Sequence, residues 1–229
     1  MRILAALFGL LTSALVTFAF LAPRLPPNWI PWHAPVLDAP ATQFAHFQLN
    51  RLKFNSEMCL GALRAAAELS FVSLPDRKIG DDCGHTNVVR IESAPIAHNS
   101  EPSATCALAA ALYWWEQDLK QQALEIFNVP LARIDHVGKF FCRNVNSEAS
   151  GRRSQHATAN AIDISGFVLA DGRRITIASV WNSSGPAAEF VQTARNRACR
   201  YFNGVLSPDY NKLHADHLHL DFGPYLICR

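Results

Sequence analysis

The chain has 229 residues, of which 49% are hydrophobic and 17% are charged, and these values are typical of a folded globular protein. Its formal net charge of +2 gives no sign of a nucleic-acid surface, so nucleic acid is not an expected partner. Without its N-terminal segment the chain retains roughly 185 to 205 residues, enough for one domain with a hydrophobic core.

The N-terminal residues 3–21 form a run of 19 residues without a charged side chain. Such a run is just long enough to cross a bilayer as a helix. A cleaved signal peptide normally has a shorter apolar region and a small-x-small cleavage site, and the candidates at 17–19 and 20–22 fit that pattern poorly. We therefore expect residues 1–22 to be a signal anchor in preference to a cleaved signal peptide. Both interpretations place the remaining chain outside the cytoplasm. The third interpretation is that the apolar run is a buried helix of the domain core.

Proline dominates the next segment, with six prolines between residues 22 and 40. Proline at this density blocks helices and sheet ladders, so residues 23–43 are expected to form an extended linker. Trp29 and Trp32 suit either the membrane interface or packing against the domain. The folded domain is expected over residues 44–229.

Six cysteines are scattered through this domain, and none stands in a C-x-x-C pair, so a structural zinc knuckle is not expected. An even number of cysteines on an exported chain indicates three disulfides. Six free buried thiols are the alternative, and the sequence does not choose among the possible pairings.

Apolar residues at helical spacing predict three helices, at 56–69, 103–127 and 186–203. Alternation and turn signals predict strands at 86–91, 134–142, 161–169, 174–179 and 218–222. Ser56 and Ser103 are the expected N-caps, and Asp171-Gly172 predicts a hairpin. The fold class expected from this order is α+β, as a single domain with a small antiparallel sheet packed by helices.

The first chemical motif is His156 with Asp163, seven residues later. Asp163 lies in an alternating stretch between Ile162 and Ile164. A carboxylate beside two buried isoleucines is costly unless it is paired or metal-bound.

The second motif contains three histidines and two aspartates within residues 214–221. The period of a strand places His217 and His219 on one face. Two neighbouring imidazoles can share one site, where one binds a cation and the other transfers protons.

Two histidines and one carboxylate leave a coordination position open on a tetrahedral ion, which is the catalytic pattern for Zn²⁺. The same donors could hold non-haem Fe(II), although nothing else indicates an oxygenase. The simplest alternative is that each histidine is a satisfied polar residue without a metal.

At these residues the sequence resembles the bacterial extensin-like C-terminal domain, over residues 55–228 and most strongly after residue 140. That domain is similar to zinc peptidases such as lysostaphin, the D-alanyl-D-alanine peptidases and hedgehog. The signature S-x-H-x(6)-D is met by Ser154, His156 and Asp163. The signature H-x-x-H-x-H of penicillin-insensitive murein endopeptidases is met by His214, His217 and His219.

The resemblance implies Zn²⁺ ligands at His156, Asp163 and His219. His217 would be the general base or would stabilise the tetrahedral intermediate. His214 would contact a ligand or the substrate.

Three further positions acquire a meaning from the resemblance. Arg143 would stabilise an oxyanion or bind a substrate carboxylate, although it could be an ordinary surface arginine. Asp216 could be the base in place of His217, or could orient an imidazole. Ala159 stands where relatives often have glycine, so a positive φ there would be strained.

The function that the resemblance implies is a peptidoglycan endopeptidase that cleaves stem peptides, on the periplasmic side of the inner membrane of a Gram-negative bacterium. The alternatives are a D-alanyl-D-alanine carboxypeptidase and a non-catalytic zinc-containing wall-binding protein. No nucleophile motif surrounds Ser154, so acyl transfer is not expected. The sequence indicates no protein partner.

Overall fold

The computed structural model of the protein describes residues 7–13, 16–17, 24–80, 83–137 and 140–229. Most of the expected signal anchor lies outside these residues, and its described parts, 7–13 and 16–17, are helical. Among the described residues, no helix has the length and apolar character needed to cross a membrane.

The centre of the domain is a mixed sheet with strand order β12-β10-β11-β8-β7-β5, and β9 pairs with β8. Its described strands are β5 (Ala97–His98), β7 (Leu131–His136), β8 (Ala161–Leu169), β9 (Arg174–Thr176), β10 (Gly204–Leu206), β11 (Leu218–Asp221) and β12 (Ile227–Cys228). The α+β class is confirmed, but the expected small antiparallel sheet is larger and includes two parallel pairs, β10–β12 and β5–β7. Both parallel pairs join distant segments, which alternation within one segment does not reveal.

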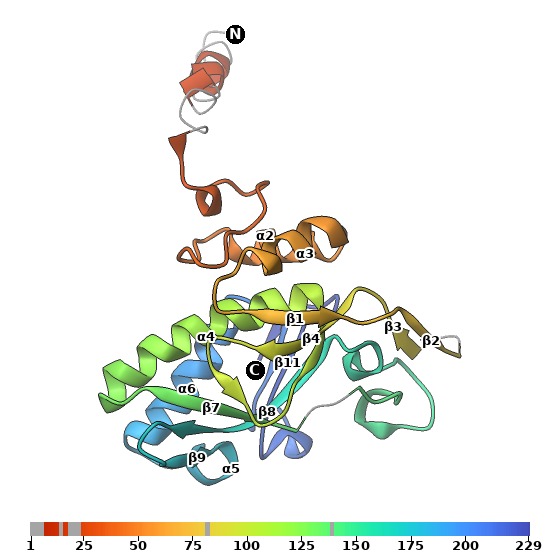
Figure 1. Ribbon diagram of the computed structural model, residues 1–229, viewed down its shortest axis with the longest axis vertical. Helices are drawn as coiled ribbons and strands as arrows, with labels where there is room; N and C mark the ends of the chain where they lie inside the picture. The colour runs from red at the N-terminus through yellow and green to blue at the C-terminus, as the bar shows by residue number, and fades with distance from the viewer. Residues whose placement is uncertain (1–6, 14–15, 18–23, 81–82, 138–139) are drawn as a thin grey trace.

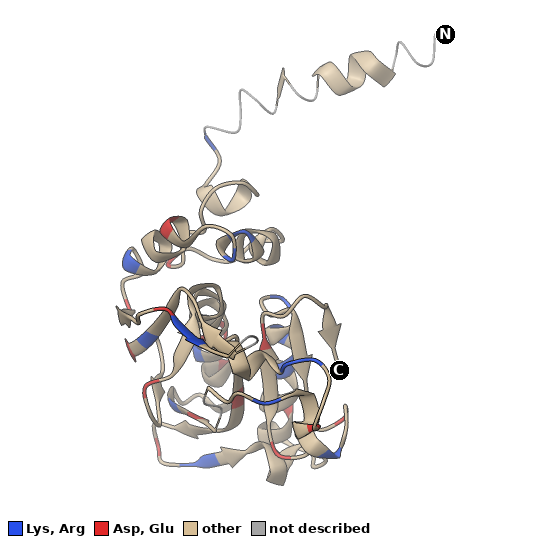
Figure 2. Cartoon of the chain, turned by 90° about the vertical axis from the view of Figure 1, so that its right-hand side faces the viewer, with Lys and Arg blue, Asp and Glu red and all other residues tan. Residues whose placement is uncertain are grey.

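The long helices α4 and α6 pack on the central sheet through buried aromatic side chains. The described helices are α2 (Ala45–Leu52), α3 (Ser56–Arg64), α4 (Cys106–Phe127), α5 (Ile177–Val180) and α6 (Pro186–Ala198). Trp115 of α4 is fully buried, contacts Phe167 of β8, and donates from Nε1 to the carbonyl oxygen of Ala194 in α6. A single side chain thus joins both long helices to the central strand. In Figures 1 and 2, α2 and α3 form a separate layer at the N-terminal end of the domain.

Two smaller sheets complete the fold. One contains β1 (Ser70–Ser73), β4 (Val88–Ser93) and β6 (Ser103–Thr105), and the other β2 (Arg77–Ile79) and β3 (Cys83–His85). The prediction that α4 begins at Ser103 is wrong, because Ser103 pairs with Arg90 in the β4–β6 ladder. The cap of α3 is also one residue earlier than expected, since the Asn55 side chain accepts from the Met58 amide.

The expected hairpin is confirmed: β8 pairs antiparallel with β9, and Gly172 in the turn has φ +89°. The other expected elements occur with shifted ends. The strand expected at 134–142 is β7, the helix expected at 186–203 ends at Ala198, and residues 177–180 form α5 rather than part of a strand.

The proline-rich segment is not an extended tether over its described residues. Asn28 is buried, and its side chain bonds both the amide and the carbonyl of Val36. Asp38 accepts hydrogen bonds from the Ala67 amide and the Tyr113 hydroxyl. Hydrogen bonds of its side chains thus attach the segment to Tyr113 of α4 and to the turn after α3.

All six cysteines lie among the described residues and form disulfides, Cys59–Cys106, Cys83–Cys142 and Cys199–Cys228. The expectation of three disulfides is confirmed. Such bonds persist in oxidising compartments, so they indicate an extracytoplasmic protein.

Candidate metal centre

Strand pairing brings the two predicted motifs together. In the β8–β11 ladder, Asp163 lies directly opposite His219, although 56 positions separate them along the chain. His156 reaches the same point from a short 3₁₀ helix, η4 (Gln155–Thr158), that precedes β8. The Ser154 hydroxyl accepts from the His156 amide and caps this helix. Ser154 therefore helps to position the backbone of a predicted ligand.

The turn between His156 and Asp163 requires an unusual backbone conformation. Ala159 ends η4 with φ +54°, in the left-handed region. A side chain in this region costs about 1–2 kcal/mol, so the position where relatives often have glycine is strained here. The surrounding fold offsets that cost by fixing the approach of His156 to β8.

The three side chains converge on one point with the spacing of a tetrahedral metal site. His156 Nε2 and His219 Nδ1 are 3.2 Å apart. Asp163 Oδ1 lies 2.8 Å from His219 Nδ1, and its Oδ2 lies 3.1 Å from His156 Nε2. Ligands of tetrahedral zinc lie about 3.3 Å apart, given bond lengths of about 2.0–2.1 Å. Among the described residues, these three are the group whose donor atoms could hold a metal ion.

The electrostatics of this group favour a positive charge at its centre. Burial alone would raise the pKa of the Asp163 carboxyl, but hydrogen bonds from His156 and His219 outweigh burial and hold the pKa far below its usual range. Burial lowers the pKa of His219, yet hydrogen bonds to Asp163 and Asp221 raise it to about 9. The carboxylates thus stabilise positive charge where a divalent cation would bind.

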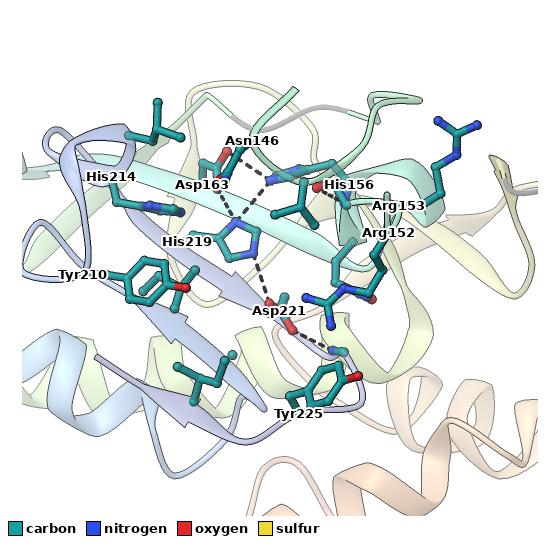
Figure 3. Close-up of a pocket in the computed structure, with 18 of the residues that line it drawn as sticks. Asn146, Arg152, Arg153, His156, Asp163, Tyr210, His214, His219, Asp221 and Tyr225 are labelled. Atoms are coloured by element: carbon teal, nitrogen blue, oxygen red, sulfur yellow. Dashed lines mark hydrogen bonds and ion pairs between the residues drawn. The ribbon is translucent and has the colours of Figure 1, made fainter. Parts of the chain in front are cut away.

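Asp221 is a functional residue that the sequence reasoning did not select. Its Oδ2 lies 3.1 Å from Nε2 of His219, the ring nitrogen that faces away from the centre (Figure 3). The Gly223 amide donates to Oδ1 at 2.6 Å and holds the carboxylate in place. A carboxylate on the outer nitrogen fixes the tautomer and orientation of a metal-binding histidine. The signal available in the sequence was the spacing of two residues from His219, which places both side chains on the same face of a strand.

His217 lies beside the centre without belonging to its ligands. Its Nε2 is 3.7 Å from Asp163 Oδ1, and its Nδ1 is 2.8 Å from Asp216 Oδ1. The Asp216 side chain is 75% exposed and bonds His217 directly. This arrangement suits His217 to proton transfer and Asp216 to orienting its ring.

His214 packs at the edge of the same cluster. Its ring centroid lies 5.1 Å from that of His217 and 5.9 Å from that of His219. Its Nδ1 is 2.8 Å from Asn211 Oδ1. Burial lowers the pKa of His214 to about 4, with a smaller electrostatic contribution from the neighbouring His217 and His219, so this imidazole is neutral near pH 7.

The cluster opens into a pocket of about 250 Å³. Arg143 lines this pocket, and its Nη1 donates to the Ser147 hydroxyl at 3.0 Å. In Figure 3, Tyr210 and His214 lie on one side of His219, and Tyr225 lies on the other. Six of the seven residues predicted for the site therefore line one pocket, with Arg143 in its wall and not in the histidine cluster, and the seventh, Asp216, reaches the site through its bond to His217.

Comparison with known proteins supports the family resemblance. The family model described as the extensin-like protein C-terminus matches residues 57–229. No curated protein and no solved structure matches the chain. Since the matched region is well over half of the chain and contains the whole histidine cluster, the chain belongs to the extensin-like C-terminal family.

Proposed function

We propose that this protein is a zinc-dependent peptidase that cleaves peptidoglycan stem peptides. The observation that carries the proposal is the convergence of His156, Asp163 and His219 at tetrahedral spacing, with a further histidine at the open side. Two histidines and one carboxylate form the donor set of catalytic zinc sites. The similarity of the family to zinc peptidases of the cell wall supplies the substrate class.

Zinc held by these ligands would supply a Lewis acid for the amide carbonyl and lower the pKa of a coordinated water to about 7. The chain itself supplies the proton transfer. His217 presents Nε2 to the site while Asp216 holds Nδ1, so the ring is positioned to take a proton from water and deliver it to the leaving amine. His214 can contact the substrate as a neutral imidazole.

The pocket favours an endopeptidase over a carboxypeptidase. Side chains line it on both sides of the histidine cluster, with Tyr210 on one side and Tyr225 on the other. A substrate can therefore extend in both directions from the bond that is cut. A carboxypeptidase would need a closed end for the released residue.

We further propose that the protein acts in the periplasm of a Gram-negative bacterium, held at the inner membrane by its N-terminal apolar segment. The three disulfides support an oxidising location. The 19 uncharged residues at 3–21 support the membrane attachment.

The test uses the full chain in detergent, metal analysis, and digestion of purified muropeptides followed by mass spectrometry. We expect one zinc per chain and cleavage of cross-linked dimers in preference to free pentapeptides. His217→Gln should retain zinc and lose cleavage. Preference for free pentapeptides would favour the carboxypeptidase, and full cleavage by His217→Gln would contradict the assigned proton transfer. Zinc without cleavage of any muropeptide would favour a wall-binding protein.

A further inference from the structure

A short hairpin gathers three arginines at the wall of the metal pocket. Asn144 and Arg153 form an antiparallel bridge, and the Val145 amide donates to the Arg152 carbonyl at 2.9 Å. The Ser154 amide closes the hairpin by donating to the Arg143 carbonyl at 3.0 Å. Arg143, Arg152 and Arg153 therefore all line the pocket directly before the first metal-binding histidine.

These three guanidinium groups have no carboxylate partner among the described residues. Arg143 donates to the Ser147 hydroxyl, and Arg153 donates to the Asn144 side-chain oxygen, both neutral groups. Some other arginines of the chain pair with acids, as Arg133 does with Asp135. Gathering three like charges without a direct ion-pair partner is unfavourable, and an anion bound to them would reduce their repulsion.

The guanidinium of Arg152 is positioned by an aromatic side chain. Its guanidinium carbon lies 4.7 Å from the centroid of the Tyr225 ring. Figure 3 shows this pair on the Asp221 side of the histidine cluster. Stacking on an aromatic face fixes the plane of a guanidinium while leaving its in-plane N–H donors free for a bidentate carboxylate contact.

We propose that Arg152, stacked on Tyr225, binds a carboxylate of the peptide substrate beside the bond that is cut. This inference rests on the proposed peptidase function and specifies its substrate class as an acidic peptide. Asp163 and Asp221 line the same pocket, where each is hydrogen-bonded to His219, and among the described residues neither forms an ion pair with Arg143, Arg152 or Arg153. An internal carboxylate at this position agrees with the proposed endopeptidase, whereas a terminal carboxylate would place the cut at the chain end, as in a carboxypeptidase.

The experiment measures binding and cleavage separately on the full chain. The ligands are a synthetic stem peptide with free carboxylates and two derivatives, in which either the terminal or an internal carboxylate is converted to an amide. Binding is measured by calorimetry on zinc-loaded His217→Gln, so that it does not depend on cleavage. One amidation should weaken binding about 10- to 100-fold, and it identifies which carboxylate is bound.

Variants of the subsite then connect this preference to Arg152. Arg152→Gln should raise KM for the acidic peptide about 10- to 100-fold with kcat nearly unchanged. It should leave unchanged the KM for the amidated derivative that bound more weakly in the calorimetric measurement. Tyr225→Ala should raise KM for the acidic peptide by a smaller factor. Arg197→Gln, which alters an arginine on α6 outside the pocket, is the matched control.

The outcomes separate a failure of the carboxylate subsite from a failure of the proposed peptidase function. Equal binding of the acidic peptide and both amides, in a chain that cleaves muropeptides, would overturn the subsite and leave the peptidase intact. Carboxylate-dependent binding through Arg152, in a chain that cleaves no stem peptide, would overturn the peptidase and leave the subsite. Equal losses in Arg152→Gln for acidic and amidated peptides would also contradict the proposal.

Discussion

Gly204 of β10 lies directly opposite Asp221 of β11, and the absence of a side chain at Gly204 leaves the space that the Asp221 carboxylate occupies. A Cβ atom at position 204 would lie 2.2 Å from Asp221 Oδ2. Because that same oxygen bonds His219, the pairing of two strands helps to orient the ring of a candidate metal ligand.

The first prediction follows from this contact. Gly204→Ala should displace the Asp221 carboxylate and free the His219 ring, which should weaken zinc binding about 10- to 100-fold. Competition with a chromophoric chelator measures the affinity. Gly61→Ala is the matched control, because a Cβ at that helical position meets no atom within 4 Å. Unchanged affinity in Gly204→Ala would show that Asp221 does not orient the ligand.

Removal of the metal should destabilise the fold, because His156, Asp163 and His219 join η4, β8 and β11 around one centre. At free zinc a hundredfold above Kd, binding stabilises the folded state by about 2.7 kcal/mol. Calorimetry should therefore record a lower Tm after chelation. The Tm of Asp163→Asn should not respond to the chelator. A response equal to that of the unaltered chain would place the metal elsewhere.

Asp216 and His217 can be separated by their effects on cleavage. If Asp216 only orients His217, Asp216→Asn should lower kcat about 10- to 100-fold, whereas His217→Gln removes the proton carrier and should cost about 10²- to 10⁴-fold. Both variants should keep zinc, as metal analysis would show. A larger loss in Asp216→Asn than in His217→Gln would make Asp216 the base.

The stability of the sheet should depend on pH through Asp135. Burial alone would raise the pKa of this carboxyl, but hydrogen bonds from Arg174 and Arg133, the latter at 2.8 Å, lower it below its ordinary value. The folded state therefore stays ionised where the unfolded chain takes up a proton. The stabilisation is present above the unfolded pKa of about 3.9 and is lost as the pH falls through the lower, folded value.

Asp135→Asn should consequently lower the free energy of unfolding by about 1–3 kcal/mol at pH 7, and the difference should shrink in the acid range. Urea denaturation at pH 7 and pH 3 provides the measurement. Asp171→Asn removes a carboxylate from an exposed pair with Arg173 and should have a much smaller effect. A deficit in Asp135→Asn that is independent of pH would exclude the ion pairs as its cause.

Local patterns in the sequence predicted the long helices and the hairpin because their signals lie within one segment. The stripe that contains Trp115 established α4, but its start was misplaced. Whether Ser103 caps a helix or pairs in a strand depends on Arg90, thirteen positions earlier. When a residue suits both a helix cap and a strand, tertiary contacts determine its conformation, and local propensity does not include those contacts.

The candidate metal-binding group was predictable because two histidines and a carboxylate recur in a pattern typical of metal sites, and the structure brings the three side chains together. Their supporting residues were not predictable. The role of Asp221 depends on the register that places Gly204 beside it, and the role of Arg152 depends on Tyr225, which is 73 positions away. Neither relation leaves a periodic signal in the chain.

The Cys83–Cys142 bond joins the strand β3 to the residue just before Arg143, at the base of the arginine hairpin. Thiols in the cytoplasm are kept reduced, so a newly made chain there lacks the disulfide that joins this hairpin to β3. The wall of the pocket would become rigid only after export, when oxidation closes the bond. In the exported hydrolase proposed above, the pocket wall would thus be completed only in the compartment where the proposed substrate lies.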